Sequence, residues 1–212
     1  MLRILFLVLA FAFSTSINAQ DIKYGFRLGF SITTFEGEDS GGKDTNFRNG
    51  FSLGAFTSLP ISSAIRFEPG VDFATKGAKT NLDNVNSLVR NGYLDIPLLF
   101  DFQLGERFSI IGGPQPSFLL SSAMIFGEGD DKITVKGDDA KALWKDNDIA
   151  GVFGLGYSPS KTLQIQLIYE HGFANISEIS SSVYNRAIKL QLKHIFEKNL
   201  ISFEDPLGSN LV

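Results

Sequence analysis

The sequence predicts an all-β protein, an eight-stranded antiparallel transmembrane β-barrel with short turns at one end and long loops at the other. Three observations predict this fold. Apolar residues alternate with small or polar residues in eight segments, short and long connections between those segments alternate strictly, and the chain opens with an apolar stretch typical of an export signal. Because a strand sends successive side chains to opposite faces, each segment has one apolar face and one polar face.

The first segment shows the pattern. Phe26, Leu28 and Phe30 take one parity, and Arg27 and Gly29 take the other. The same alternation predicts strands at 23–35, 50–59, 64–75, 92–104, 107–121, 148–158, 162–172 and 186–196. In the core of these windows Asp, Glu, Lys and Arg fall only on the second parity, and most windows have about the length that a tilted strand needs to cross a bilayer. The apolar face is therefore expected to point outward, into lipid.

Later strands repeat this division. Their apolar parity comprises Leu53 and Leu59, Ile65 and Phe73, Leu94 and Phe102, Ile110 and Phe118, Phe153 and Leu155, Leu163 and Leu167, and Ile188 and Leu192, in chain order. Four prolines nevertheless lie inside predicted strands, at 69, 97, 114 and 116. Since proline cannot donate a ladder hydrogen bond, we expect local bulges there, with Gly112 and Gly113 contributing one in the fifth strand.

The connections predict which end faces which compartment. Short turns lie at 60–63, 105–106 and 159–161, and long polar loops at 36–49, 76–91, 122–147 and 173–185. Outer-membrane barrels have short periplasmic turns and long extracellular loops. The pattern therefore predicts periplasmic termini.

Residues 1–19 are predicted to be a cleavable signal peptide, with Arg3 before an apolar run and Ala19 at the cleavage point. A membrane anchor is the alternative, but the run is shorter than the about 20 residues that a spanning helix needs. The prediction is export to the outer membrane, with a barrel domain at 20–196 and a polar C-terminal tail at 197–212. Lipids, periplasmic chaperones and the barrel-assembly machinery are then the expected partners.

Composition excludes several other classes of protein. The chain has no cysteine, so disulfides and thiolate metal sites are absent. Its net charge is −4 with dispersed basic residues, which is not the footprint of a nucleic-acid-binding protein. No motif indicates a cofactor.

Several phrases resemble the PorT-like outer-membrane β-barrel domain family of Bacteroidetes. They are YLDIPLLFDFQLG at 93–105, IRFEPGVDFATKGAK at 65–79, GGPQPSFLLS at 112–121, DIAGVFGLGYSP at 148–159 and IYEHGFANIS at 168–177. The resemblance implies the barrel fold, the outer membrane and an accessory role in protein secretion, but it brings no catalytic motif. The tail after Phe196 departs from family members, which usually end at the aromatic residue closing the last strand.

The inward charges are the main candidate site. They are Arg27, Arg66, Glu68, Asp72, Asp95, Asp101, Glu170, Lys189 and Lys193. Side chains fill the interior of an eight-stranded barrel, and charges there must pair to offset desolvation. We therefore expect a structural ion-pair network, with no catalytic, cofactor or metal site, in a non-enzymatic envelope protein. Proton handling and a narrow channel are alternatives.

A lipid-active enzyme at the rim is a further alternative, using Glu170, His171 and Ser177. Both histidines, His171 and His194, take the outward parity, and Glu170 takes the opposite one. A nucleophilic site needs its histidine and acid within hydrogen-bond reach, which adjacent strand positions do not provide. The headgroup region is the expected place for both histidines.

The long loops offer two weaker candidates. Their acids, Glu36, Glu38, Asp39, Asp44, Asp130, Asp131, Asp138 and Asp139, lack the regular spacing of a calcium loop. Phe126 and Trp144 in the loop 122–147 are candidate contacts for a protein partner, unless that loop packs over the barrel mouth.

The alternative fold is a soluble lipocalin-like ligand-binding barrel, with the apolar parity facing inward.

Overall fold

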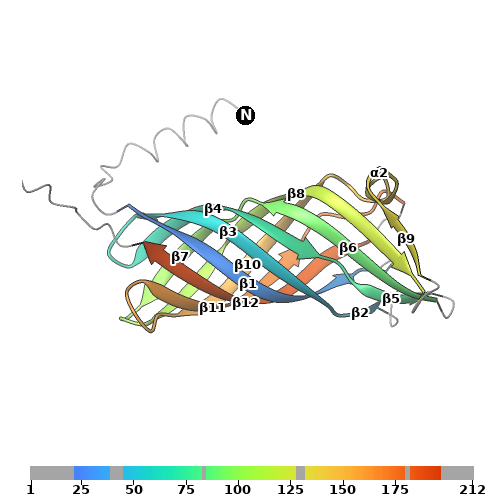
Figure 1. Ribbon diagram of the computed structural model, residues 1–212. Helices are drawn as coiled ribbons and strands as arrows, with labels where there is room; N and C mark the ends of the chain where they lie inside the picture. The colour runs from blue at the N-terminus through green and yellow to red at the C-terminus, as the bar shows by residue number, and fades with distance from the viewer. Residues whose placement is uncertain (1–21, 39–44, 83–84, 128–131, 180–181, 197–212) are drawn as a thin grey trace, which may run out of the picture.

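The protein is a closed antiparallel barrel in the computed structural model, which describes residues 22–38, 45–82, 85–127, 132–179 and 182–196 (Figure 1). The predicted signal peptide and C-terminal tail lie outside the described residues. The barrel strands are β1 (Lys23–Glu36), β3 (Arg48–Pro60), β4 (Ile65–Lys76), β6 (Val85–Asp95) with β7 (Leu98–Leu104), β8 (Phe108–Phe126), β10 (Asn147–Tyr157), β11 (Leu163–Gly172) and β12 (Tyr184–Phe196).

Pairing between the first and last strands closes the barrel. β1 pairs with β12 on one side and β3 on the other, and β8 pairs with β10 to complete the ring. β6 and β7 both pair with β4 and β8, so together they make one barrel strand. The predicted eight-stranded antiparallel barrel is confirmed.

The irregularities lie elsewhere than predicted. The expected bulge at Gly112 and Gly113 is wrong, because β8 pairs with β10 without a register shift from Phe108 to Phe118. The bulge lies further along β8, at Leu120, because Gly92 and Tyr93 are consecutive on β6 but pair with Ser121 and Leu119, and the neighbouring strand is interrupted between β6 and β7 at Pro97. A missing N–H is therefore accommodated by a broken strand at Pro97, while Pro114 and Pro116 stay within the ladder.

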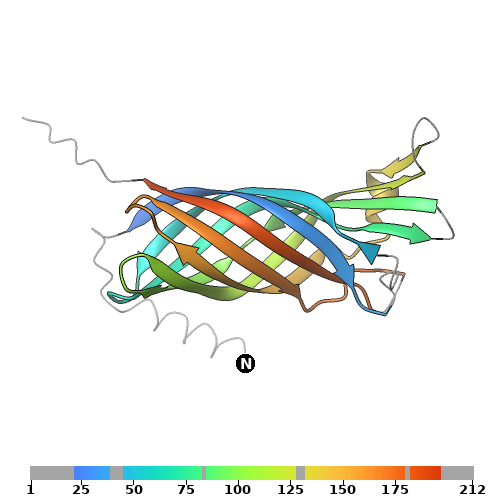
Figure 2. The same cartoon turned by 90° about the horizontal axis from the view of Figure 1, so that it is seen from below.

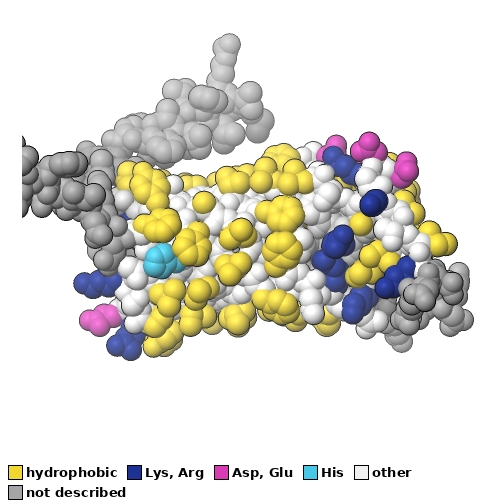
Figure 3. All heavy atoms as spheres, in the orientation of Figure 1, with side chains coloured by type: hydrophobic (Ala, Val, Ile, Leu, Met, Phe, Trp, Pro, Cys, Tyr) yellow, Lys and Arg dark blue, Asp and Glu magenta, His cyan; other side chains and the backbone are white. Residues whose placement is uncertain are grey.

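The apolar parity covers the outside of the barrel. Leu28 is 52% exposed, Leu53 53% and Leu190 58%, and yellow side chains form a broad belt in Figure 3. A water-soluble monomer rarely exposes so much contiguous apolar surface, whereas a bilayer solvates it. The lipocalin-like alternative is wrong, since it needs these side chains inside.

No helix among the described residues is long and apolar enough to cross a membrane.

Connections 61–64, 105–107 and 158–162 lie at one end, called here the terminal end because β1 begins and β12 ends there. At the opposite end, the loop end, β6 and β8 run beyond the barrel and pair with short strands β5 (Lys79–Leu82) and β9 (Ile133–Lys136), while β2 (Thr45–Asn46) pairs with β5 (Figure 2). This β2–β5–β6–β8–β9 sheet is called the extension. Much of the predicted loops 76–91 and 122–147 is therefore strand. The short strands β5 and β9 form because the long β6–β8 pair extends beyond the barrel, where β5 pairs with the free edge of β6 and β9 with the free edge of β8.

A small apolar core lies at the loop end. Its apolar side chains converge from β1, β6, β8 and the connecting segments, and they are Phe35, Ala78, Val89, Met124, Trp144, Ile176 and Val183. The short helix α2 (Asp138–Lys141) precedes Trp144 and buries Ala140. This set is called the mouth cluster below.

Candidate functional site

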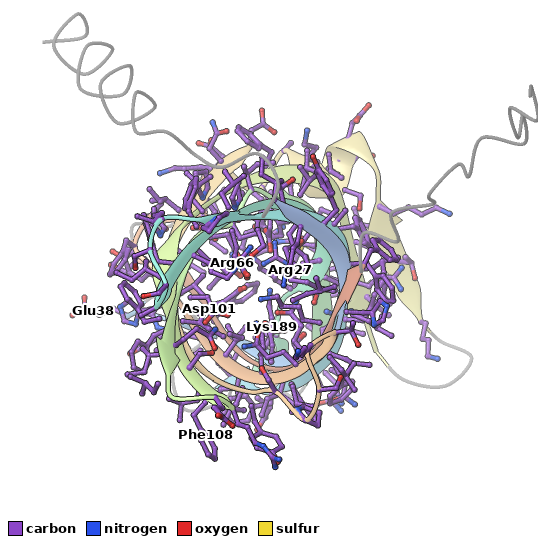
Figure 4. All side chains as sticks on the ribbon, turned by 90° about the vertical axis from the view of Figure 1, so that its left-hand side faces the viewer. Arg27, Glu38, Arg66, Asp101, Phe108 and Lys189 are labelled. Carbon is purple, nitrogen blue, oxygen red and sulfur yellow. The ribbon has the colours of Figure 1, made fainter. Side chains whose placement is uncertain are left out.

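The candidate site is the barrel interior, where the predicted inward charges meet. Eight of the nine are at most 4% exposed, and Arg66 is half-buried. Figure 4 shows labelled Arg27, Arg66, Asp101 and Lys189 within the ring of strands, while Glu38 and Phe108 lie outside it.

A central cluster contains two cations and two anions. Lys76 Nζ lies 3.0 Å from Asp95 Oδ1 and 3.5 Å from Glu170 Oε2. Lys189 pairs with the same two acids, in close contact with Glu170 and 3.8 Å from Asp95 Oδ2. Gln115 Nε2 donates to both carboxylates at 3.1 Å. The four formal charges cancel, which suits groups that water cannot reach.

A second cluster lies nearer the terminal end, around Lys193. Its ammonium group donates to both oxygens of Glu68 at 2.6 Å, and it lies 3.3 Å from Asp101 Oδ2. Ser58 Oγ also donates to Glu68, at 2.8 Å, and accepts from Arg66 Nε at 2.6 Å. The set joins β3, β4, β7 and β12 through one buried lysine.

Arg27 and Asp72 form a further ion pair in the interior, and its geometry depends on a glycine. Arg27, Gly54 and Asp72 are direct cross-strand neighbours on β1, β3 and β4. Because the middle residue has no side chain, Arg27 Nη2 reaches Asp72 Oδ1 at 3.3 Å across it. A Cβ on Gly54 would overlap the Asp72 carboxylate. The inward glycine makes room for charge.

Two inward aromatic rings complete the packing. Phe56 lies under two cations, with Arg27 Cζ 5.2 Å and Lys193 Nζ 5.0 Å from its centroid. Tyr93 receives Lys76 in the same way at 5.1 Å. A ring face attracts a cation, so these rings stabilise charges where they fill space.

Sequence reasoning missed Lys76 and Asp148. Lys76 was assigned to a loop, although it continues the inward parity of Asp72 and Ala74. Extending the predicted strand by one residue would have found it. Asp148 is 4% exposed and accepts from Asn185 Nδ2 at 2.9 Å, and its parity in the predicted strand 148–158 was the available signal.

The interior opens at the terminal end and is covered at the loop end. A pocket of about 640 Å³ reaches Glu68, Asp101 and Lys193 from the terminal end. At the loop end the mouth cluster packs over the polar interior, with the rings of Phe35 and Trp144 5.2 Å apart. The central cluster lies between these two ends.

The loop candidates take different positions. Trp144 packs inward in the mouth cluster, as expected of a loop that covers the barrel mouth, whereas Phe126 lies in the extension, paired with Ile133 of β9. Glu36 forms an ion pair with Arg186, and Asp138 and Asp139 form the first turn of α2. Asp39, Asp44, Asp130 and Asp131 lie outside the described residues.

The residues of the rim-enzyme alternative do not face one another. Glu170 points into the central cluster, while His171 lies outside, with its Nδ1 3.2 Å from Tyr169 Oη and its ring 5.0 Å from that of Phe173. His194 likewise lies among outward rings, 5.3 Å from Phe26. Ser177 is buried near the barrel mouth, where it pairs with Trp144.

Two solved structures and one protein family are similar to this chain. The chain is similar to the solved structure of Neisserial surface protein A, with 11% sequence identity and a TM-score of 0.49 over 82% of this chain and 97% of that chain. It is also similar to Ail, the attachment invasion locus protein of Yersinia pestis, with 12% identity and a TM-score of 0.48 over 82% of this chain and 98% of that chain. No curated protein matches it. Residues 18–178 match the family described as outer membrane protein beta-barrel domain, and the chain therefore belongs to this outer-membrane family.

Proposed function

We propose that this protein is a non-enzymatic barrel of the outer membrane, sealed to solutes, that works as a structural element and as a platform for a protein partner. The observation that carries the proposal is the filled interior. Lys76 bridges two acids in mid-barrel, and the mouth cluster covers the polar interior beyond them.

The ion pairs support a structural role. Arg27 and each buried lysine contact at least one acid within 3.5 Å, and each cluster links strands far apart in sequence. Such a network holds the barrel in one register, since a slip would leave buried charges without partners. No catalytic role is assigned to these residues.

The extension supports the platform role. In the proposed orientation the terminal end faces the periplasm and the loop end faces outward, after removal of the signal peptide. Phe126 and Ile133, of which the latter is 66% exposed, then lie on the extracellular side of the membrane, where a protein partner can reach them. The PorT-like resemblance suggests that the partner belongs to protein secretion, with this barrel as an accessory.

Two measurements test the proposal. In planar bilayers the full chain should give no stable conductance, because the paired side chains of the central cluster and the mouth cluster lie across the barrel interior. A photo-crosslinking residue at position 126 should capture a protein in intact outer membranes, whereas the same residue at lipid-facing position 28 should not. Steady single-channel currents would contradict the sealed barrel. Equal capture at both positions would contradict the platform.

A further inference from the structure

The outer face of the extension carries cations and apolar groups together. Lys79, Leu88, Ile125 and Thr134 are successive cross-strand neighbours on β5, β6, β8 and β9, so they share one face of the sheet. Arg90 and Lys136 occupy the next row of that face, on either side of Ala123. The opposite face carries Val89 and Met124, which belong to the mouth cluster. The first face therefore points away from the barrel axis.

A pocket of about 720 Å³ lies on this surface. Lys79 on β5 and Lys132, just before β9, line it from strands on the two sides of the β6–β8 pair. Leu88, Ile125 and the 62%-exposed Phe47 supply its apolar lining. The pocket thus offers two ammonium groups around an apolar surface. This combination suits an amphiphile with an anionic head.

The described strands that form this face place no acid on it. Strands β5, β8 and β9 contain no Asp or Glu, and the single acid of β6, Asp95, is buried in the central cluster. Lys79, Arg90, Lys132 and Lys136 are all exposed. In Figure 3 several dark-blue side chains lie beyond the right-hand edge of the yellow belt, below the magenta group at the top. Among the described residues, these four cations form no ion pair with an acid.

The same strand continues from the lipid-facing surface into this patch. On β8, Phe118 is 46% exposed and Leu120 52% exposed within the apolar belt, and Ile125 follows at the edge of the pocket. An anionic group at this height lies where lipid headgroups meet water. Long Lys and Arg side chains reach such groups from an apolar surface.

We propose that the pocket formed by Lys79, Lys132, Phe47, Leu88 and Ile125, assisted by Arg90, binds the phosphate-bearing headgroup of a lipid in the adjoining leaflet. The lysines hold the phosphate, and the apolar lining takes the beginning of the acyl chains. The inference rests on the proposed membrane barrel and names a lipid partner for its loop end.

The test uses the full chain in nanodiscs of phosphatidylcholine containing phosphatidic acid. Native mass spectrometry of the released barrels counts the two lipids that stay bound. The wild type should retain phosphatidic acid in preference to phosphatidylcholine. The variant K79Q/R90Q/K132Q should lose this preference by about fivefold for each cation removed, the effect of roughly one charge near an anionic surface.

A matched variant at the opposite end, K23Q/R107Q/K161Q, removes three exposed cations near the terminal end and should keep the preference. A shift in gel mobility on boiling checks that both variants are folded. Equal loss in both triple variants, or no loss in the first, overturns the proposal. Displacement of phosphatidic acid by excess inorganic phosphate would also overturn it, because the site would then bind a free anion rather than a lipid.

Orientation is tested separately, so that the two proposals can fail independently. Nanodiscs present the same lipids on both sides, so lipid retention does not depend on which end faces outward. Because the chain has no cysteine, Ile133→Cys adds a unique thiol to the extension. A membrane-impermeant maleimide should label it on intact cells. Failure to label would contradict the proposed orientation and leave the lipid site standing.

Discussion

Replacing Lys76 with methionine removes the cation at the centre of the barrel while keeping most of its volume. The side chain is 1% exposed, and its ammonium group lies 3.0 Å from Asp95 and 3.5 Å from Glu170. At an effective dielectric constant of 20, each attraction is worth about 5 kcal/mol before desolvation is subtracted. Breaking a buried pair on one side costs about 3–5 kcal/mol net, so we expect K76M to lower the free energy of unfolding by that amount.

The double variant K76M/D95N separates charge from packing. In this variant the remaining charges of the central cluster, Lys189 and Glu170, still pair and cancel. Its loss in the free energy of unfolding should therefore be about 2 kcal/mol smaller than the sum of the losses in the two single variants. Urea unfolding from lipid vesicles, followed by the fluorescence of the single tryptophan, measures all three values. Lys161→Met in the exposed turn 158–162 is the control and should change stability by less than about 0.5 kcal/mol.

Two outcomes would refute this reasoning. A loss below about 1 kcal/mol for K76M would mean that the central pairs do not hold the barrel together. Strict additivity in the cycle would mean that Lys76 and Asp95 act independently, although they are in contact.

Three further predictions concern packing, the barrel mouth and the lipid face. Gly54→Ala should destabilise the barrel by about 1–3 kcal/mol in the same urea assay, because its Cβ overlaps a buried carboxylate, whereas Gly112→Ala meets nothing closer than 3.5 Å and should be nearly neutral. Equal effects of the two alanines would argue against the space-making role of the first glycine. Phe35→Ala should shift the emission of Trp144 to longer wavelength, since their rings are 5.2 Å apart, and an unchanged spectrum would show that the mouth is not packed as described. Leu28→Arg should cost about 2–4 kcal/mol if it lies near the bilayer midplane, and a neutral result would mean that this face does not meet lipid.

Much of the fold followed from the two-residue period of the strands. The pleat sends Leu28 outward and Arg27 inward whatever the rest of the chain does, so the barrel, its apolar surface and the inward charges could be assigned from local pattern. The bulge was misplaced because prolines mark a strained stretch without showing at which residue the register shifts, and the shift lies at Leu120 of the same strand. The chain breaks at Pro97 and runs straight through Pro114.

The extension and the mouth cluster were not predictable in this way. Residues 79–82 show no alternation and residues 133–136 alternate over only four positions, which is too short to predict a strand; both become strands because β6 and β8 offer edges beyond the barrel. For Trp144 the sequence left open whether its loop contacts a partner or packs over the barrel mouth, and the apolar side chains that converge on it from β1, β6 and the segment after β11 decide for packing.

The division between local pattern and folded structure has one physical cause. Whether a side chain points inward is decided by its neighbours along the strand, which the amino-acid order displays. Which inward groups meet is decided by how the sheet closes on itself, because closure and stagger set the height of every strand against strands remote in the chain. Lys76 therefore meets Glu170, 94 positions later, through a contact that only the closed barrel creates.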